Sequence, residues 1–381
     1  MKIGVPLETT PGETRVALTP LLVTALLRDK HEVMIETGAG LRASFTDAAY
    51  LQAGATIVPD AKPIWAQAEM IFKVQPPRAL PNGQHEADAL REGVQIISFL
   101  APFANAEVIK TLARRKVTAY SMEFVPRITR AQSMDALSSQ ATVAGYKAVL
   151  VGAEAMPKMF PLLMTAAGTI APANVLILGV GVAGLQAIAT AKRLGAKVEA
   201  FDPRPAVKEQ VKSLGATFVE MEMPKDAETA GGYAKELSPE FIQKEMEAIG
   251  GRLPKMDLVI CTAQIFGKKA PLLITGEMVK LLRPGSVIVD FTGDLGGNCE
   301  LTQPGKTIDV SGVTLIGAVN LPATVPLDAS GLYAKNVCNL FKHLYPKPDS
   351  TPDVADDIVK GACLTRGGEI VNETLKKTLS L

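Results

Sequence analysis

A glycine-rich turn between an apolar strand pattern and a helical pattern constrains the fold of this chain more than any other feature. Residues 174–178 form a short apolar run, the sequence Gly179-Val-Gly181-Val-Ala-Gly184 follows, and residues 185–193 have helical composition. This G-x-G-x-x-G spacing is typical of the first β-α unit of a doubly wound sheet that binds a dinucleotide. Gly179 permits the tight turn, Gly181 lets the backbone approach a pyrophosphate, and Gly184 lets the helix pack closely on the strand.

An acidic residue at the end of the next strand pattern indicates which dinucleotide binds. Asp202 follows the apolar run 197–201, at the separation from Gly179 that the motif requires. A carboxylate there accepts hydrogen bonds from the adenosine ribose hydroxyls and repels a 2′-phosphate. The sequence therefore predicts NAD(H). Arg204 leaves NADP(H) open, and its alternative interpretation is a surface cation beside Asp202.

The segment that contains the glycine motif has the composition of a membrane span, because residues 159–191 contain no charged residue and no histidine. Length alone would permit a transmembrane helix. Prolines and glycines divide the run, so we interpret it as a loop, a buried parallel strand and its crossover helix. The first residues, 1–6, begin directly with a strand pattern and lack the apolar core of an export signal, which predicts a cytoplasmic location.

Composition excludes several classes of protein. The 381 residues suggest two or three domains at roughly 150 residues each. The 40 basic and 39 acidic residues nearly cancel, so we expect no nucleic-acid partner and no direct membrane insertion. The cysteines are too far apart in sequence for a redox pair or a clustered zinc site, and we expect no metal. They are Cys261, Cys299, Cys338 and Cys363.

The order of strand and helix patterns predicts an α/β fold with two Rossmann-like parallel-sheet domains separated by a cleft. Short strand and helix patterns alternate through the first 125 residues, and a second series begins near Ala136. The C-terminal tail is too short for its own core, so we expect it to return to the first domain. The predicted domains are residues 1–135 with 320–381, and residues 136–319.

A polar segment at the predicted domain boundary is a candidate ligand site. Residues 127–140 combine cations, amides, hydroxyls and a carboxylate, and ligand sites favour such junctions. Arg127 with Asp135 would offer the donors and the acceptor that a nicotinamide carboxamide needs. The structural alternative is a helix start capped by Ser133 or Asp135.

A second polar segment, residues 222–245, lies between two apolar strand patterns. The paired glycines Gly231 and Gly232 beside Tyr233 suit a lid that closes over a ligand. A surface loop with an incidental tyrosine explains the same pattern.

At these residues the chain resembles the NAD(H)-binding component, domain I or the alpha-1 subunit, of proton-translocating NAD(P) transhydrogenase. The similarity runs from residue 2 to about residue 366 and is strongest in residues 130–135, 179–195 and 229–236. The resemblance implies a homodimeric, peripheral subunit on the inner face of the cell membrane. It would bind NADH and pass hydride directly to NADP⁺ on a partner subunit, while a membrane-spanning subunit couples this transfer to proton translocation.

The resemblance also implies which residues contact the nucleotide. Arg127, Gln132, Asp135 and Ser138 would position the nicotinamide for hydride transfer. Two positions depart from the family pattern: Glu245 stands where a glutamine is expected, and Gln264 begins a less apolar loop. With the fingerprint glycines Gly179, Gly181 and Gly184 included, the predicted nucleotide contacts are Arg127, Ile128, Thr129, Gln132, Ser133, Met134, Asp135, Ser138, Gly179, Gly181, Val182, Gly184, Asp202, Pro203, Arg204, Gly232, Tyr233, Glu245 and Gln264.

Alanine dehydrogenase has the same architecture and is the alternative function. Arg15 and Lys73 match its substrate-type cations, but reductive amination also needs an acid or base near the reacting carbon. In that family a histidine follows a Phe-Leu pair, whereas Ala101 follows it here. Hydride transfer between two nicotinamides needs no such group. A non-enzymatic NAD-binding regulator is a further alternative, and the roles of Arg15 and Lys73 stay open between nucleotide contact and internal ion pairing.

Overall fold

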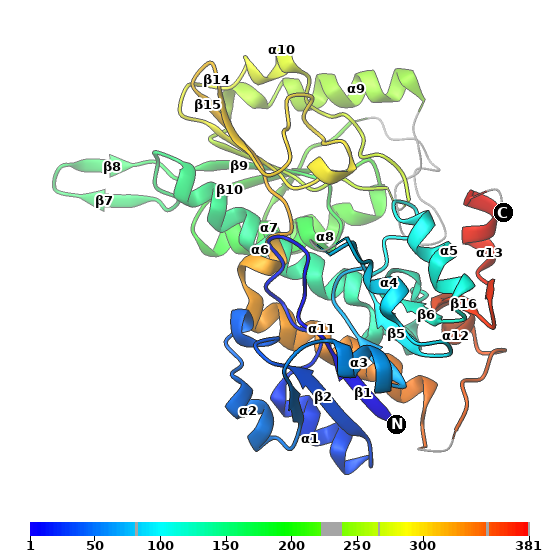
Figure 1. Ribbon diagram of the computed structural model, residues 1–381. Coiled ribbons are helices and arrows are strands. Elements are labelled where there is room, and N and C mark those ends of the chain that lie inside the picture. The colour runs from blue at the N-terminus through cyan, green and yellow to red at the C-terminus, as the bar shows by residue number, and fades with distance from the viewer. Residues whose placement is uncertain (81–82, 222–237, 266, 348–349, 380–381) are drawn as a thin grey trace. The chain divides into compact units, whose positions relative to one another are not determined.

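The computed structural model describes residues 1–80, 83–221, 238–265, 267–347 and 350–379 (Figure 1). The chain divides into two compact units. Unit 1 comprises Met1–Gln140 and Pro322–Leu381, and unit 2 comprises Ala141–Leu321. The first boundary falls within helix α6 (Ala136–Ala155).

Unit 1 contains, within the described residues, an eight-stranded sheet in the order β17-β16-β6-β5-β4-β1-β2-β3. Strands β1 to β6 pair in parallel, because helical crossovers separate most of them along the chain. The strands are β1 (Lys2–Val5), β2 (Glu32–Glu36), β3 (Thr56–Val58), β4 (Met70–Phe72), β5 (Gln95–Ser98), β6 (Thr118–Ser121), β16 (Cys363–Arg366) and β17 (Glu369–Ile370).

Helices cover both faces of this sheet, and apolar side chains fill the space on each side. One face carries α1 (Pro20–Arg28), α2 (Asp47–Gln52), α11 (Pro326–Leu344) and α12 (Asp357–Ala362). The other carries α3 (Lys62–Gln67), α4 (Glu86–Ala89), α5 (Ala106–Arg114) and α13 (Glu373–Leu379). Burial on both faces explains why the parallel strands are nearly continuous apolar runs.

The C-terminal segment returns to unit 1, as predicted. Strand β16 pairs antiparallel with β6, where Cys363 faces Tyr120. In α11, Tyr333 and Phe341 are fully buried, and the Phe341 ring lies 5.5 Å from that of Phe72 in β4. The tail therefore completes the core of the first unit.

Unit 2 contains, in its described part, a seven-stranded sheet in the order β11-β10-β9-β12-β13-β15-β14. All neighbours are parallel except β14, which is antiparallel to β15. The strand order reverses between β9 and β12, the point at which open α/β sheets bind ligands. The strands are β9 (Asn174–Leu178), β10 (Lys197–Phe201), β11 (Thr217–Phe218), β12 (Leu258–Cys261), β13 (Val287–Asp290), β14 (Thr307–Val310) and β15 (Val313–Gly317).

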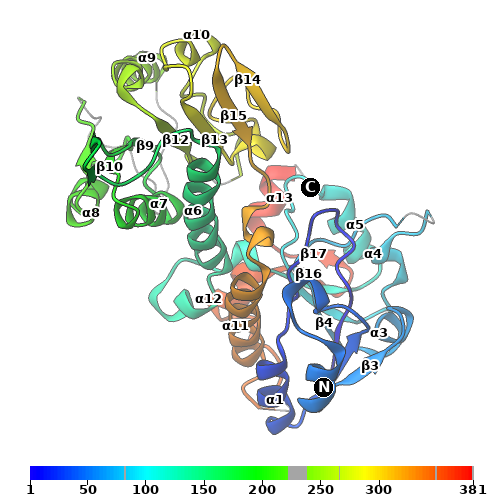
Figure 2. The ribbon, with the colours of Figure 1, turned by 90° about the vertical axis from the view of Figure 1, so that its left-hand side faces the viewer.

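Helices again lie on both faces. The unit 2 part of α6, together with α7 (Val182–Arg193) and α8 (Lys208–Ser213), covers one face, and α9 (Pro239–Gly250) and α10 (Gly276–Val279) cover the other (Figures 1 and 2). This two-unit, parallel-dominated α/β architecture confirms the predicted fold class.

The uncharged run 159–191 divides as predicted into a buried strand, β9, and a helix, α7. Its first part, interpreted as a loop, is an antiparallel hairpin of β7 (Leu163–Thr165) and β8 (Gly168–Ile170), which extends outward from the sheet of unit 2 (Figure 1). Among the described residues, no helix is long and apolar enough to span a membrane.

Candidate functional site

The glycine fingerprint forms a tight turn between β9 and α7. Gly179 has φ +91°, and a side chain on it would lie 2.8 Å from the backbone of Ala263. A Cβ on Gly184 would lie 2.0 Å from the carbonyl oxygen of Gly179. Around Gly181, the residue that caps α7, a Cβ would meet nothing within 4 Å. The turn is therefore closed beneath the helix and open at its N-terminus, where backbone N–H groups favour an anion.

Asp202 lies directly after β10 and is 3% exposed. Its Oδ2 accepts the Val180 N–H at 2.7 Å, and its Oδ1 accepts the Arg204 N–H at 2.9 Å. The Arg204 guanidinium completes the arrangement, with Nε 2.8 Å from Oδ1 and Nη2 2.9 Å from Oδ2. Because a carboxylate has about four acceptor positions, a ribose hydroxyl that binds here must share or displace an Arg204 bond.

Glu245, in the middle of α9, is another buried carboxyl group of unit 2 and is 5% exposed. Burial and the neighbouring Asp202 carboxylate raise the pKa of Glu245 to about 7. This raised pKa favours the protonated carboxyl group, which can donate as well as accept a hydrogen bond. The glutamine that the family pattern leads one to expect has the same two capacities.

Gln264, three residues beyond Cys261, the last residue of β12, is exposed. Sequence reasoning missed the side chain that holds this loop: the Asn298 amide accepts the N–H of Ala263 and donates to the Ala263 carbonyl, each at 2.9 Å. Asp290 in turn accepts the N–H of Asn298 at 2.9 Å. An Asn-Cys pair in a loop matches no sequence motif, so only the structure shows that Asn298 and Asp290 hold this loop.

Residues 127–138, here called the polar loop, lie in unit 1 and include a short 3-10 helix, Thr129–Met134. Its buried side chains Ala131 and Met134 belong to the core of unit 1. The side chains of Arg127, Ile128, Thr129, Gln132 and Ser133 are exposed, and those of Asp135 and Ser138 are half-buried.

The structure brings Asp135 and Ser138 together at the start of α6. Asp135 accepts the Ser138 N–H at 2.8 Å with one oxygen and the Ser138 hydroxyl at 2.6 Å with the other. Asp135 thus makes the capping bonds that the structural alternative predicted. These bonds also fix the orientation of its carboxylate.

The remaining predicted contacts fall into two groups. Val182, 36% exposed, begins α7, and Pro203 follows Asp202 in unit 2. Gly232 and Tyr233, the proposed lid residues, lie outside the described residues.

Two family models together match almost the whole chain. The N-terminal domain model of "Alanine dehydrogenase/PNT" matches residues 4–144, and the C-terminal domain model matches residues 148–373. The chain belongs to the alanine dehydrogenase/PNT family. The resemblance inferred from the sequence is thereby confirmed.

Relatives within the alanine dehydrogenase/PNT family bear both names. The first part of the NAD(P) transhydrogenase subunit alpha of Rhodospirillum rubrum is 50% identical over 379 residues, which cover 98% of this chain and 99% of that protein. The alanine dehydrogenase of Bacillus subtilis is 32% identical over 388 residues, which cover 100% of this chain and 95% of that protein. Among solved structures, the transhydrogenase of Sinorhizobium meliloti superposes with a TM-score of 0.87 at 40% sequence identity, and the match covers 97% of this chain and 100% of that one. An L-alanine dehydrogenase superposes with a TM-score of 0.82 at 29% identity, and the match covers 100% of this chain and 99% of that one.

Arg15, predicted from the sequence to match a substrate-type cation of the dehydrogenase alternative, is buried and paired. Its guanidinium forms a bidentate pair with the Glu13 carboxylate, with Nε 2.8 Å from Oε1 and Nη2 2.7 Å from Oε2. Burial opposes ionisation of Glu13, but the hydrogen bonds and charge of Arg15 lower the pKa of Glu13 to about 2. Nη1 donates to the amide oxygen of Gln140 at 2.8 Å. Arg15 is therefore an internal ion-pair partner.

Lys73 is likewise buried, at 1% exposure, between two carboxylates. Its Nζ lies 3.3 Å from Glu8 Oε2 and 3.4 Å from Glu86 Oε2. Burial acts to lower the pKa of Lys73, but the two carboxylates raise it. The ammonium thus stays charged and is neutralised within unit 1.

The three histidines have structural surroundings. The His31 ring stacks edge-on against Phe341 with ring centroids 5.0 Å apart, and His85 accepts the Ala87 N–H at the start of α4. His343 lies 3.0 Å from the Asp356 carboxylate. In the described part of the chain, no group of three or more His, Cys, Asp or Glu side chains could hold a metal ion.

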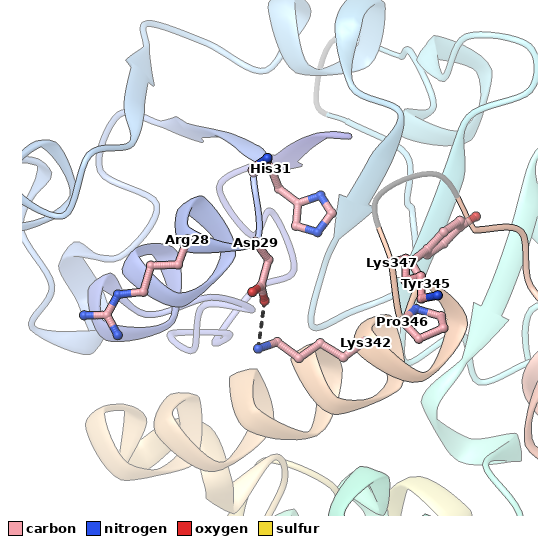
Figure 3. A pocket seen from close by; sticks show the side chains of 8 residues that line it. Arg28, Asp29, His31, Lys342, Tyr345, Pro346 and Lys347 are labelled. Atoms are coloured by element: carbon pink, nitrogen blue, oxygen red, sulfur yellow. Dashed lines mark ion pairs between the residues drawn. The ribbon is translucent and has the colours of Figure 1, made fainter.

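A cavity of about 360 Å³ lies in unit 1 where α1 and α11 end (Figure 3). Lys342 and Asp29 form an ion pair of 3.0 Å at its edge. Basic residues in the last turns of helices offset the helix dipole, which accounts for this composition. Of the predicted site residues that the structure describes, none lines this cavity. Its lining is Arg28, Asp29, Lys30, His31, Lys342, Tyr345, Pro346 and Lys347.

Proposed function

We propose that this chain is the NAD(H)-binding component of a proton-translocating NAD(P) transhydrogenase. The observation that carries the proposal is its 50% identity, over nearly the whole of both chains, with the Rhodospirillum rubrum transhydrogenase subunit. Identity with the alanine dehydrogenase of Bacillus subtilis is 32%.

The geometry of unit 2 supports an NAD(H) site. The open N-terminus of α7 at Gly181 would receive the pyrophosphate, and Asp202 would receive the adenosine ribose. Arg204 is committed to Asp202 by two side-chain bonds, so it is poorly placed to attract a 2′-phosphate. This pairing supports NAD(H) over NADP(H). Glu245 places a second carboxyl group in the same region and supports the same preference.

In the proposed reaction, hydride passes from C4 of NADH to C4 of NADP⁺ on the partner, which requires the two carbons to be held roughly 3–3.5 Å apart. Arg127, Gln132, Asp135 and Ser138 would position the nicotinamide. The Ser138 bonds aim the Asp135 carboxylate, which would accept from the carboxamide NH₂, while Arg127 or Gln132 would donate to its oxygen. Positioning of this kind needs no protein acid or base.

The ion pairs of Arg15 and Lys73 within unit 1 disfavour the dehydrogenase alternative. Arg15 and Lys73 are neutralised by buried glutamates, so neither offers an uncompensated charge to a substrate carboxylate. At the position of the family's histidine stands Ala101, whose backbone N–H donates to Glu123 at 2.7 Å.

The proposal includes partners and location. An NADP(H)-binding subunit would supply the second nucleotide and a membrane-spanning subunit the proton path, with this chain peripheral on the cytoplasmic side. A homodimer is supported by the β7–β8 hairpin, on which Met164 is 75% and Ile170 40% exposed. The predicted cleft between the domains and the domain boundaries belong to the same proposal.

The deciding experiment measures reduction of an NAD analogue by NADPH, with the purified chain added to membranes stripped of it that retain the NADP-binding partner. A rate that requires both components supports the proposal. NADH oxidation by the chain alone with pyruvate and ammonium would establish an amino-acid dehydrogenase instead. NADH binding with no reaction in either assay would favour the regulator.

A further inference from the structure

A series of hydrogen bonds in unit 1 connects the buried Arg15 with the polar loop. The first link is the bond from Arg15 Nη1 to Gln140 Oε1. Gln140, 5% exposed, donates from Nε2 to the Ala329 carbonyl at 3.1 Å and also approaches the Ser139 hydroxyl at 3.3 Å. The glutamine side chain is therefore fixed on both sides.

The second part of the series crosses from α6 to α11. The Ser139 hydroxyl donates to Asn336 Oδ1 at 2.7 Å, and Asn336 Nδ2 donates to the carbonyl oxygen of Ser133 at 2.9 Å. Asn336 is 7% exposed, and its two bonds leave one orientation for its amide. One turn further along α11, Asn339 Nδ2 donates to the same Ser133 oxygen at 3.0 Å.

The bonds converge on one backbone atom inside the segment predicted to hold the nicotinamide. Ser133 follows Gln132 directly and precedes Asp135 by two positions. A carbonyl oxygen with two lone pairs, each taken by an amide of one rigid helix, has little freedom to move. Arg130 adds a second attachment, with Nη1 2.5 Å from the Asp356 carboxylate at the start of α12.

We propose that Asn336 and Asn339, with Gln140 and Arg15 behind Asn336, are positioning residues that hold the polar loop in the geometry for hydride transfer. This inference rests on the proposed function of the loop. None of these four residues needs to touch the nucleotide. Their effect would fall on the transfer rate, because a displacement of about 1 Å in a reacting pair costs on the order of a hundredfold.

The proposal also accounts for the buried charges. Burying Arg15 and Glu13 is costly unless their hydrogen bonds are satisfied, and such networks often define one local structure among several. Here the guanidinium is bonded through Nε, Nη1 and Nη2. Through its bond to Gln140, the fixed guanidinium restrains the start of α6, where Asp135 and Ser138 lie.

The test compares two variants of the series with one matched control. Asn336→Asp is nearly isosteric but places an acceptor against the Ser133 carbonyl, and Asn339→Leu removes the neighbouring donor from a half-buried position. The control, Tyr345→Phe, removes a hydroxyl that donates to Gln95 at 2.7 Å in the same unit, outside the series. Each chain is combined with stripped membranes, and the single-turnover transfer rate, the NADH Kd and the isotope effect with 4-deuterated NADH are measured.

We expect Asn336→Asp to slow transfer by about tenfold to a hundredfold and Asn339→Leu by a few-fold, with NADH Kd changed less than about threefold. The deuterium isotope effect should rise toward its intrinsic value, because the hydride step becomes slower than the steps around it. Tyr345→Phe should change none of the three quantities.

Unchanged transfer in a folded Asn336→Asp chain would overturn the proposal, as would parallel losses in all three variants. If Asn336→Asp does not fold, Asn339→Leu decides by the same criteria. Failure of the proposed function is distinguishable, since the unsubstituted chain would then show no transfer at all.

Discussion

The glycine turn of unit 2 and the polar loop of unit 1 are built in opposite ways. The tightest contact in the turn is local: Gly179 and Gly184 are five positions apart, and the carbonyl oxygen of Gly179 excludes a side chain on Gly184. The loop after β12, at Ala263, closes the other side of Gly179. The polar loop is held from a distance, because Ser133 is bonded by Asn336 and Asn339, which are 203 and 206 positions away.

The difference follows from what each region has to do. A pyrophosphate is bound by backbone N–H groups at a helix start, so the site mainly needs glycine residues, which leave those groups accessible. A nicotinamide ring that must transfer hydride needs an orientation, and orientation requires attachment to rigid elements. Substitutions should therefore affect folding and binding in the turn, but the rate of transfer in the loop.

The largest effect that we expect is that of Gly184→Ala. A methyl group 2.0 Å from a backbone oxygen forces β9 and α7 apart, which should cost about 3 kcal/mol of stability and abolish measurable NADH binding. Thermal unfolding and calorimetric titration with NADH measure the two quantities.

Gly181→Ala is the matched comparison for that substitution. Its backbone is extended, with φ −79° and ψ −166°, and nothing lies within 4 Å of the added methyl group. We expect an unchanged melting temperature with NADH affinity weakened at least tenfold, because the methyl group takes the space of the pyrophosphate. Equal losses of stability in both variants would contradict the distinction between a closed and an open side of the turn.

The same contrast explains what could be predicted from the sequence. The strand–turn–helix around Gly179 and the acidic residue at 202 depend on local spacing, and the structure has β9, α7 and β10 where the patterns placed them. Apolar strand patterns likewise indicated the parallel core of each sheet. The short length of the tail was sufficient to predict its return to the first unit.

Other elements lack such local signals. The β7–β8 hairpin has no buried face that would impose an alternating pattern, and its strands are three residues each, so it resembled a loop. Strand β14 is a polar antiparallel edge, with the pattern Thr-Ile-Asp-Val. The pairing of Arg15 with Gln140 and the contact of Asn336 with Ser133 join residues far apart in sequence, so one sequence alone does not reveal them.

Asp135→Asn tests whether the polar loop acts on rate independently of its structural role. Asparagine caps helices about as well as aspartate, so α6 should start as before and the melting temperature should change little. Removing the charge weakens the acceptor offered to the carboxamide, and we expect hydride transfer to slow about tenfold with NADH Kd changed much less. A loss of stability without a loss of rate would reduce Asp135 to a helix cap.

Glu245→Gln gives the smallest expected effect and asks whether charge, as well as glycine, shapes the region around the turn. The folded chain raises the pKa of Glu245 from 4.5 to about 7, so between these values it retains a proton that the unfolded chain has lost. Stability contributed by this group is therefore present at low pH and is lost as the pH rises from about 4.5 through 7.

Glutamine does not titrate, so the Glu245→Gln variant should gain stability relative to the parent as the pH rises from 5 to 8. Because the pKa of Glu245 in the folded chain lies about 2.5 units above 4.5, we expect the melting temperature of the variant relative to the parent to increase by roughly a few degrees across this interval. Glu240→Gln, at an exposed position of the same helix, is the control and should follow the parent. If the two variants show the same pH dependence, burial and the Asp202 charge do not raise the pKa of Glu245 in the folded chain.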